Sequence, residues 1–128
     1  MLDTSAYAAF KRGHEEAASA LRKYPEILLS SIVLGELWAG FEVGSKREQN
    51  RQELDAFLAS PRVAMAPVTG ETAVRYAAIY AYLRANGRLI PTNDLWIAAL
   101  AMEHGAPLLT ADAHFLHVPQ ILVSHLAM

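Results

Sequence analysis

Four acidic residues stand in apolar surroundings where a solvated surface would not place them, and together they could hold a divalent cation. Asp3 and Asp112 each follow a short apolar segment, whereas Glu36 lies inside an apolar helical pattern. Asp94 opens a helix that is otherwise nearly apolar, and none of the four acids has an obvious basic partner nearby in sequence. A carboxylate in such surroundings costs several kcal/mol unless its charge is compensated. A shared ion would supply that compensation, because hard dications such as Mg²⁺ or Mn²⁺ take oxygen ligands.

Helical spacing places two of the acids on defined faces. Glu36 shares the i, i+3, i+4 pattern with Val33 and Leu37, which puts it on the core-facing side of a helix. Asp94 lies in the first turn of another helix, where the helix dipole stabilises a carboxylate by roughly 0.3–1 kcal/mol. Taken singly, Glu36 could instead extend into water at the edge of its apolar stripe. Asp94 could likewise be present only because an acid in the first turn interacts favourably with the helix dipole.

Asp3 and Asp112 follow predicted strands. Ligand sites in open α/β sheets form beyond the carboxyl ends of the strands. Each of these residues alone could be a plain N-cap of the next helix, but the four acids as a set favour a metal site. An ion bound there could lower the pKa of a bound water and orient it at a phosphorus, and a second ion could stabilise the leaving oxygen. The sequence leaves open whether one or two ions bind.

The elements that must position these acids alternate between strand and helix. Apolar runs bounded by turn residues predict strands at 1–2, 26–29, 63–66, 107–109 and 121–123. Helical spacing predicts helices at 5–12, 15–23, 32–42, 46–59, 69–85 and 93–104, and a helical turn at 113–116. Ser30 or Ser31 is the expected N-cap of the third helix, and Thr92 or Asn93 that of the sixth. Strands separated by helices favour a central, mostly parallel sheet in a three-layer α/β/α domain.

Length and composition exclude several classes of protein. A chain of 128 residues is expected to form a single domain, 1–128, with its own core. The absence of cysteine excludes disulfides and Cys-ligated metal sites. No apolar run is long enough to span a bilayer and no signal-peptide pattern is present, so we expect no membrane partner and a cytoplasmic location. The formal charge of −2 becomes +2 when the four carboxylates are set aside, which leaves the remaining surface mildly basic.

Four short motifs occur in the order typical of one nuclease family. They are Leu2-Asp3-Thr4-Ser5, Ser30-Ser31 through Gly35-Glu36-Leu37, Asn93-Asp94-Leu95-Trp96-Ile97-Ala98-Ala99, and Leu108-Leu109-Thr110-Ala111-Asp112 through Phe115. Through these motifs, and over essentially its whole length, the chain closely resembles the small PIN-domain ribonucleases that act as VapC-type toxins in bacterial toxin–antitoxin pairs.

The resemblance implies a PIN-like fold and a metal-dependent endoribonuclease that uses Mg²⁺ or Mn²⁺ and cleaves structured RNA such as transfer RNA. By motif match, Asp3, Glu36 and Asp94 would be the core carboxylates that bind the metal. Asp112 matches a position that carries either Asp or Asn in the family. The matches at supporting polar positions are Ser5, Asn93 and Thr110.

The resemblance also implies a cognate antitoxin that wraps the toxin and inserts a basic side chain into the acidic site. An amphipathic helix of this partner could lie in a groove between the third and fourth predicted helices. The groove residues would be Leu34, Trp38, Phe41, Leu54 and Phe57. The alternative is that Trp38 and Phe57 complete the core.

Other side chains suggest RNA contacts and self-association. Lys11 and Arg12 follow the Asp3 motif and Arg88 precedes the Asp94 helix, so all three are candidates to bind RNA phosphates. A stripe of Tyr76, Tyr80 and Leu83 is expected in the core, with a homodimer face as its second interpretation.

The five histidines show no paired ligand spacing on one helix face, so they are expected to be structural. His114 and His117 are the ones closest to Asp112 in sequence.

Two other function classes fit an α/β chain of this kind. One is a phosphohydrolase with Asp3 as its nucleophile, although Ser5 stands where a second Asp would be expected and no glycine-rich phosphate loop is present. The other is a catalytically silent nucleic-acid-binding module. Retention of all four acids argues against the second class.

Overall fold

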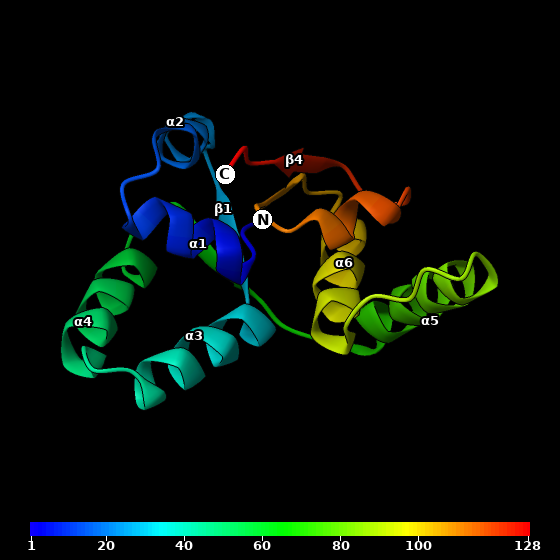
Figure 1. Cartoon of the computed structure of the whole chain (residues 1–128), viewed down its shortest axis with the longest axis horizontal. Coiled ribbons are helices and arrows are strands. Elements are labelled where there is room, and N and C mark those ends of the chain that lie inside the picture. Colours follow the sequence, from blue (N-terminus) through cyan, green and yellow to red (C-terminus); the bar gives the residue numbers. More distant parts are fainter.

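The structure is a computed structural model that describes residues 1–128 (Figure 1). Its helices are α1 (Thr4–Lys11), α2 (Glu15–Lys23), α3 (Ser31–Val43), α4 (Arg47–Leu58), α5 (Gly70–Ala85) and α6 (Thr92–His104), with the short 3₁₀ helix η1 (Ala113–His117). Its strands are β1 (Ile27–Ser30), β2 (Val63–Ala66), β3 (Leu108–Thr110) and β4 (Val123–His125).

A single residue at the start of the chain joins two strand pairs into one sheet. β1 pairs with β2 from Ile27↔Val63 onward, and β3 pairs with β4 from Leu108↔Val123 onward, both in parallel. Leu2 bridges in parallel to Leu29 of β1 and to Leu109 of β3. The spatial order is therefore β2, β1, the Leu2 segment, β3 and β4, which confirms a parallel central sheet.

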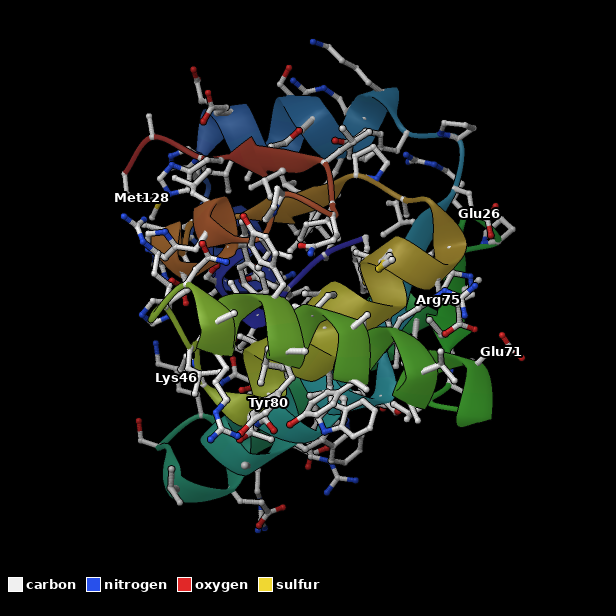
Figure 2. The ribbon with its side chains drawn as sticks, turned by 90° about the vertical axis from the view of Figure 1, so that its right-hand side faces the viewer. Glu26, Lys46, Glu71, Arg75, Tyr80 and Met128 are labelled. Carbon is white, nitrogen blue, oxygen red and sulfur yellow. The ribbon has the colours of Figure 1, made fainter.

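Helices cover the strands on both sides, as expected for an α/β/α arrangement. In Figure 1, α1, α2 and α4 lie to the left of the strands, and α5 and α6 lie to the right. The helix α6 runs through the core, and its residues from Ile97 to Ala101 are all buried. The helix α5 packs on α6 and turns its other face outward, as the green ribbon nearest the viewer in Figure 2 shows.

Local sequence explains where the elements next to the acids begin. The Ser30 hydroxyl accepts a hydrogen bond from the backbone N–H of Val33 at 3.0 Å, so Ser30 is the N-cap, as one of the two predicted candidates, and α3 starts at Ser31, one residue before the predicted start. Gly13 adopts φ +84° between α1 and α2, a conformation that glycine adopts without a steric penalty. The predicted side-chain cap of α6 is wrong, because Pro91 occupies the N-cap position and no side chain caps that helix.

Three strands are displaced from their predicted bounds. The strand predicted at 26–29 forms β1 at Ile27–Ser30, the one at 107–109 forms β3 at Leu108–Thr110, and the one at 121–123 forms β4 at Val123–His125. Pairing in register with β3 decides the position of β4, and this register brings His125 opposite Thr110. Separately, the structure contains no helix long and apolar enough to cross a membrane.

Candidate metal centre

Asp3 is a buried carboxylate that several donors hold at the start of α1. It is 4% exposed, and its Oδ1 accepts from the backbone N–H of Ala6 at 2.8 Å. The Ser5 hydroxyl lies 2.8 and 2.9 Å from the two carboxylate oxygens, and the Thr110 hydroxyl donates to Oδ2 at 2.6 Å. The N-cap interpretation of Asp3 is therefore correct, and the predicted supporting residues Ser5 and Thr110 both contact this carboxylate.

Glu36 is half-buried on α3 and connects three helices. The Thr4 hydroxyl of α1 donates to Oε1 at 2.6 Å, and the Asn93 amide of α6 donates to Oε2 at 3.2 Å. Asn93, predicted as a supporting residue, thus orients the Glu36 carboxylate. Both carboxylate oxygens of Glu36 therefore bond to neighbouring helices, so this side chain does not simply extend into water from the edge of its stripe.

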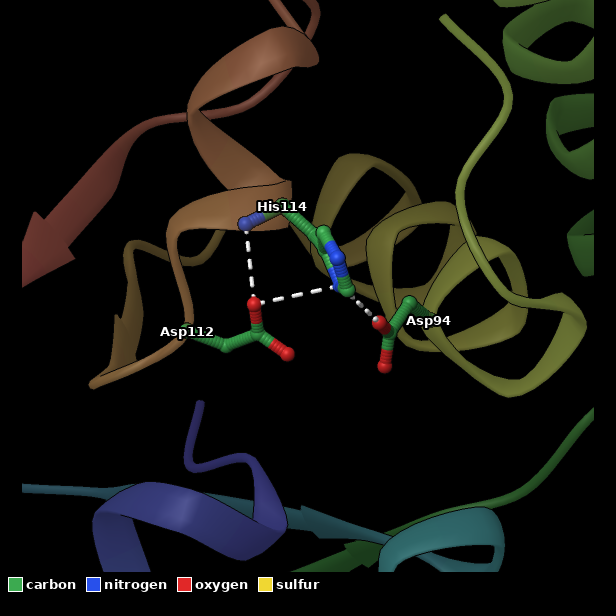
Figure 3. A group of neighbouring side chains, drawn as sticks. All are labelled: Asp94, Asp112 and His114. Carbon is green, nitrogen blue, oxygen red and sulfur yellow. Dashed lines mark hydrogen bonds and ion pairs between the residues drawn. The ribbon is translucent and has the colours of Figure 1, made fainter.

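Asp94, Asp112 and His114 form a compact group in which each side chain offers one ligand atom, and these atoms all lie within 4.8 Å of one another (Figure 3). His114 Nδ1 is 3.3 Å from Asp94 Oδ2 and 3.2 Å from Asp112 Oδ1. The exposed fractions of the side chains are 15% for Asp94, 34% for Asp112 and 51% for His114, so the group opens to solvent on the histidine side.

Local structure after β3 places Asp112 and His114 in this group. The backbone N–H of Asp112 donates to Thr110 Oγ1 at 2.9 Å, which ties the turn to the buried end of the strand. Asp112 then caps η1, because its Oδ1 accepts from the backbone N–H of His114 at 2.9 Å. Phe115 is fully buried and anchors η1, while its neighbour His114 stays at the surface beside the acids.

The acids influence one another electrostatically. Burial raises the pKa of Asp3 above its ordinary value, hydrogen bonds from Thr110, Ala6 and Ser5 oppose the rise, and the charge of Asp112 adds to it. Burial also raises the pKa of Asp94, with the charges of Asp112 and Glu36 adding to the effect and His114 opposing it. Each predicted acid therefore lies within electrostatic reach of another one.

No lysine or arginine pairs with any of these four acids. The ion pairs that lysine and arginine form are Lys11–Glu53, Arg47–Glu42 and Arg75–Glu71, and all of them lie on other surfaces. Among the basic residues, only His114 lies within ion-pair distance of any of these acids. The expectation that the acids lack a basic partner holds for the long basic side chains.

The structure places His114 beside two of the acids, a position that the sequence analysis did not predict. Ligand spacing was sought on single helix faces, whereas His114 lies on a 3₁₀ turn two residues after Asp112 and reaches an acid on α6. The sequence signal that could have found it is an Asp-x-His triplet directly after an apolar strand.

The predicted RNA-binding residues fall in two places. Lys11 pairs with Glu53 of α4 at 3.3 Å, and Lys11 and Arg12 lie at the far end of α1 from Asp3. Eight residues of helix place Lys11 roughly 12 Å from Asp3, so the structure does not bring this pair to the acids. Arg88 donates to Nδ1 of His117 at 3.0 Å, and His117 lies on η1 three residues after His114.

The expected groove between α3 and α4 exists with a different lining. A cavity of about 200 Å³ lies between α1, α3 and α4, and Leu37 and Phe41 contribute to its wall. Leu54 is fully buried instead, and Phe57 packs edge-on against Tyr7 with ring centroids 5.3 Å apart. The core interpretation is therefore confirmed for Trp38 and Phe57, which both pack against the core, and Leu54 lies within the core and not in the groove. Trp38 is half-buried, and the Arg51 guanidinium lies 4.5 Å from its ring centroid.

The aromatic stripe on α5 is divided between core and surface. Tyr76 stacks on Trp96 of α6 at 4.2 Å between centroids, and Leu83 is fully buried. Tyr80 remains exposed on the outer face of α5 (Figure 2), where Val74 is 67% exposed and Tyr82 is also exposed. Tyr76 and Leu83 of the stripe thus pack in the core, whereas Tyr80 contributes to an exposed surface of α5.

The acidic group fits a hard divalent cation by the chemistry of its donors. Carboxylates from α6 and from the loop after β3 converge, and further carboxylates lie behind them on α1 and α3. Oxygen ligands of this kind suit Mg²⁺ and Mn²⁺, and such ions favour displacement at phosphorus by activating water and neutralising charge.

Comparison with known proteins agrees with this chemistry. The PIN domain family matches residues 1–121. The chain is 32% identical to Ribonuclease VapC2 of Rickettsia felis over 98% of this chain and 96% of that protein. It is 28% identical to Ribonuclease VapC5 of Mycobacterium tuberculosis over 90% of this chain and 84% of that protein.

Solved structures show the same fold. The crystal structure of VapBC2 from Rickettsia felis bound to a DNA fragment from its promoter matches with a TM-score of 0.87 and 29% identity, covering 98% of this chain and 96% of that one. The DNA-bound VapBC from Salmonella typhimurium matches with a TM-score of 0.86 and 25% identity over the same shares.

Proposed function

The chain belongs to the PIN-domain family, with VapC ribonucleases as its relatives, and we propose that it is a metal-dependent endoribonuclease that acts as the toxin of a toxin–antitoxin pair. The observation that carries the metal dependence is the convergence of Asp94 and Asp112, whose ligand atoms lie within 4.8 Å of each other without a lysine or arginine partner. Structured RNA such as transfer RNA is the proposed substrate.

The residues of the chain divide into binding and orienting groups. Asp94 and Asp112 would bind the ion directly, and Asp3 and Glu36 would complete its anionic surroundings. Bound Mg²⁺ or Mn²⁺ would supply an activated water and neutralise charge on the phosphate. Ser5 and Thr110 hold the Asp3 carboxylate, and Asn93 holds that of Glu36, so neither acid needs to reorganise when the substrate binds.

The phosphohydrolase alternative receives no support from the site. An aspartate nucleophile must present a free oxygen to the phosphorus. Both oxygens of Asp3 accept hydrogen bonds, and the residue is buried.

The test of metal-dependent cleavage is the Asp94→Asn variant with Asp55→Asn as matched control. Asp55 is an exposed acid on α4 away from the site. Loss of one metal ligand should lower RNA cleavage by more than roughly 100-fold, whereas the control should cleave normally. Undiminished cleavage by Asp94→Asn, or full wild-type activity in excess chelator, would refute the proposal.

We also propose an antitoxin partner that covers the cavity between α1, α3 and α4. The similar VapBC structures are toxin–antitoxin systems by name, and this cavity offers apolar walls from Leu37 and Phe41. At its base lies the buried hydroxyl of Tyr7, which has no hydrogen-bond partner within the chain. A partner helix could fill the cavity with an apolar side chain, and a basic partner residue would be attracted to the acid group.

Co-expression with the neighbouring small open reading frame tests the partner. Phe41→Ser should release the partner, with Val43→Ser, an exposed position on the same helix, as control. Melting curves must show that both variants fold. A wild-type chain that purifies alone and is harmless when overproduced would contradict the toxin role.

The exposed side of α5 is the proposed homodimer surface. Val74, Tyr80 and Tyr82 are exposed on this helix, and Figure 2 shows Tyr80 together with Glu71 and Arg75 of the same helix. Val74→Glu should convert a dimer into a monomer in sedimentation experiments. An unchanged sedimentation coefficient would place the dimer contact elsewhere or show a monomer.

A further inference from the structure

We propose that His114 is a direct ligand of the metal ion, and that its imidazole makes the site prefer Mn²⁺ over Mg²⁺. This inference rests on the proposed metal-dependent function and specifies the coordination of the same site. It concerns a side chain that the acidic motifs do not include. It also narrows the choice of ion that the carboxylates alone leave open.

The geometry of the three side chains supports direct ligation. Neighbouring ligands on one octahedral ion, each about 2.1 Å from it, are about 3 Å apart. His114 Nδ1 lies 3.3 Å from Asp94 Oδ2 and 3.2 Å from Asp112 Oδ1, so these atoms already have the spacing of adjacent ligands. Figure 3 shows the imidazole edge between the two carboxylates.

The backbone holds His114 in this position independently of the imidazole. Its backbone N–H donates to Asp112 Oδ1, and the next residue, Phe115, is fully buried. The ring therefore does not need the contact with the acids to stay near them. As a ligand, His114 would use the lone pair of Nδ1, and Nε2 would carry the proton of the neutral imidazole.

The other two acids are less available than His114. The carboxylate oxygens of Asp3 accept hydrogen bonds from Ser5, Ala6 and Thr110. The carboxylate of Glu36 accepts hydrogen bonds from Thr4 and Asn93. An all-carboxylate set would need these bonds to be shared with the ion. Asp94, Asp112 and His114 can converge on one ion without breaking a bond to any of those donors.

The choice of ion follows from the nitrogen donor. Imidazole binds first-row transition ions well, whereas Mg²⁺ favours oxygen and retains waters. Mn²⁺ accepts both carboxylate and imidazole, so a mixed site gains affinity for Mn²⁺ and little for Mg²⁺. The site also has no thiolate to favour zinc.

The experiment compares Mn²⁺ and Mg²⁺ binding to the metal-free full chain by calorimetry. His114→Asn should weaken Mn²⁺ binding at least tenfold and leave Mg²⁺ binding within about threefold of wild type. His114→Asp, which restores an oxygen ligand, should favour Mg²⁺. His117→Asn on the same 3₁₀ helix is the matched control and should bind both ions normally.

Pulsed electron paramagnetic resonance gives a readout that a purely structural role would not change. Mn²⁺ bound to the wild-type chain should show coupling to a directly bound ¹⁴N, which should disappear in His114→Asn and persist in His117→Asn. Absent coupling in the wild type, or equal weakening of both ions in His114→Asn, would overturn direct ligation. Metal-dependent cleavage with Mn²⁺ bound but no nitrogen coupling would refute only this inference, whereas chelator-resistant cleavage would refute the proposed function.

Discussion

Removing the Thr110 hydroxyl should destabilise the metal-free protein by about 3 kcal/mol. Thr110 is fully buried, donates to Asp3 Oδ2 at 2.6 Å and accepts from the backbone N–H of Asp112 at 2.9 Å. Thr110→Val keeps the shape of the side chain but loses both bonds. A hydrogen bond to a charged group contributes about 1.5–3 kcal/mol, and an unpaired N–H costs about 1 kcal/mol more. The melting temperature should fall by roughly 10 °C.

The pH dependence of the destabilisation by Thr110→Val tests whether the lost hydrogen bond to ionised Asp3 causes it. The Thr110 hydrogen bond holds the pKa of Asp3 below the value that burial alone would give. The stability that this bond contributes is therefore present when Asp3 is ionised and is lost as the pH falls through the folded-state pKa of Asp3. Urea denaturation of wild type and Thr110→Val across acidic to neutral pH should show a stability difference that shrinks at low pH to the cost of about 1 kcal/mol for the unpaired Asp112 N–H.

A double-mutant cycle provides the control. In an Asp3→Asn background the acceptor is neutral, so Thr110→Val should cost only about 1 kcal/mol. Thr110→Ser retains the hydroxyl and should cost about 1 kcal/mol for the lost methyl group. If Thr110→Val costs the same with Asp3 and with Asn at that position, and the cost does not vary with pH, the proposed support of the carboxylate is wrong.

Three further measurements follow from the acid group and its surroundings. Because burial raises the pKa values of Asp3 and Asp94, metal-free stability should fall as pH rises through them, and Asp3→Asn should show a shallower fall in urea titrations. Mn²⁺ at 100 times its Kd should stabilise the wild type by about 2.7 kcal/mol and leave the melting temperature of Asp94→Asn unchanged. Arg88→Ala should weaken RNA binding and make its salt dependence shallower by about one phosphate contact, and an unchanged slope would exclude that contact.

The helices and strands could be predicted because helical spacing, apolar runs and turn residues are all visible within a few neighbouring residues. The bounds 15–23 and 63–66 agree with α2 and β2. The position of β4 could not be predicted, because its register is set by pairing with β3 and not by its own apolar residues. The side-chain cap of α6 failed for a similar reason, since the Asn93 amide bonds to Glu36 on another helix.

The site was predictable to the extent that burial of charge is visible in sequence. The four acids stand out because their neighbours are apolar, and the structure brings Asp94 and Asp112 together, with Asp3 and Glu36 within electrostatic reach of them. The position of His114 beside Asp94 was not predictable, because the two residues are 20 positions apart and belong to different elements. The ion pair of Lys11 with Glu53 could not be predicted from the sequence either, because it depends on how α1 and α4 pack against each other.

The bridge that Leu2 forms between β1 and β3 has a consequence for synthesis on the ribosome. Asp3 reaches its donor Thr110 across 107 residues of chain. At typical translation rates these residues take about 5–20 s to make, so the nascent chain carries Asp3 long before the sheet can enclose it. A chain that terminates before Leu108 keeps every α-helix but lacks both Thr110 and Asp112. Such a fragment cannot assemble the acid group, because Asp112 and His114 are translated after all six α-helices.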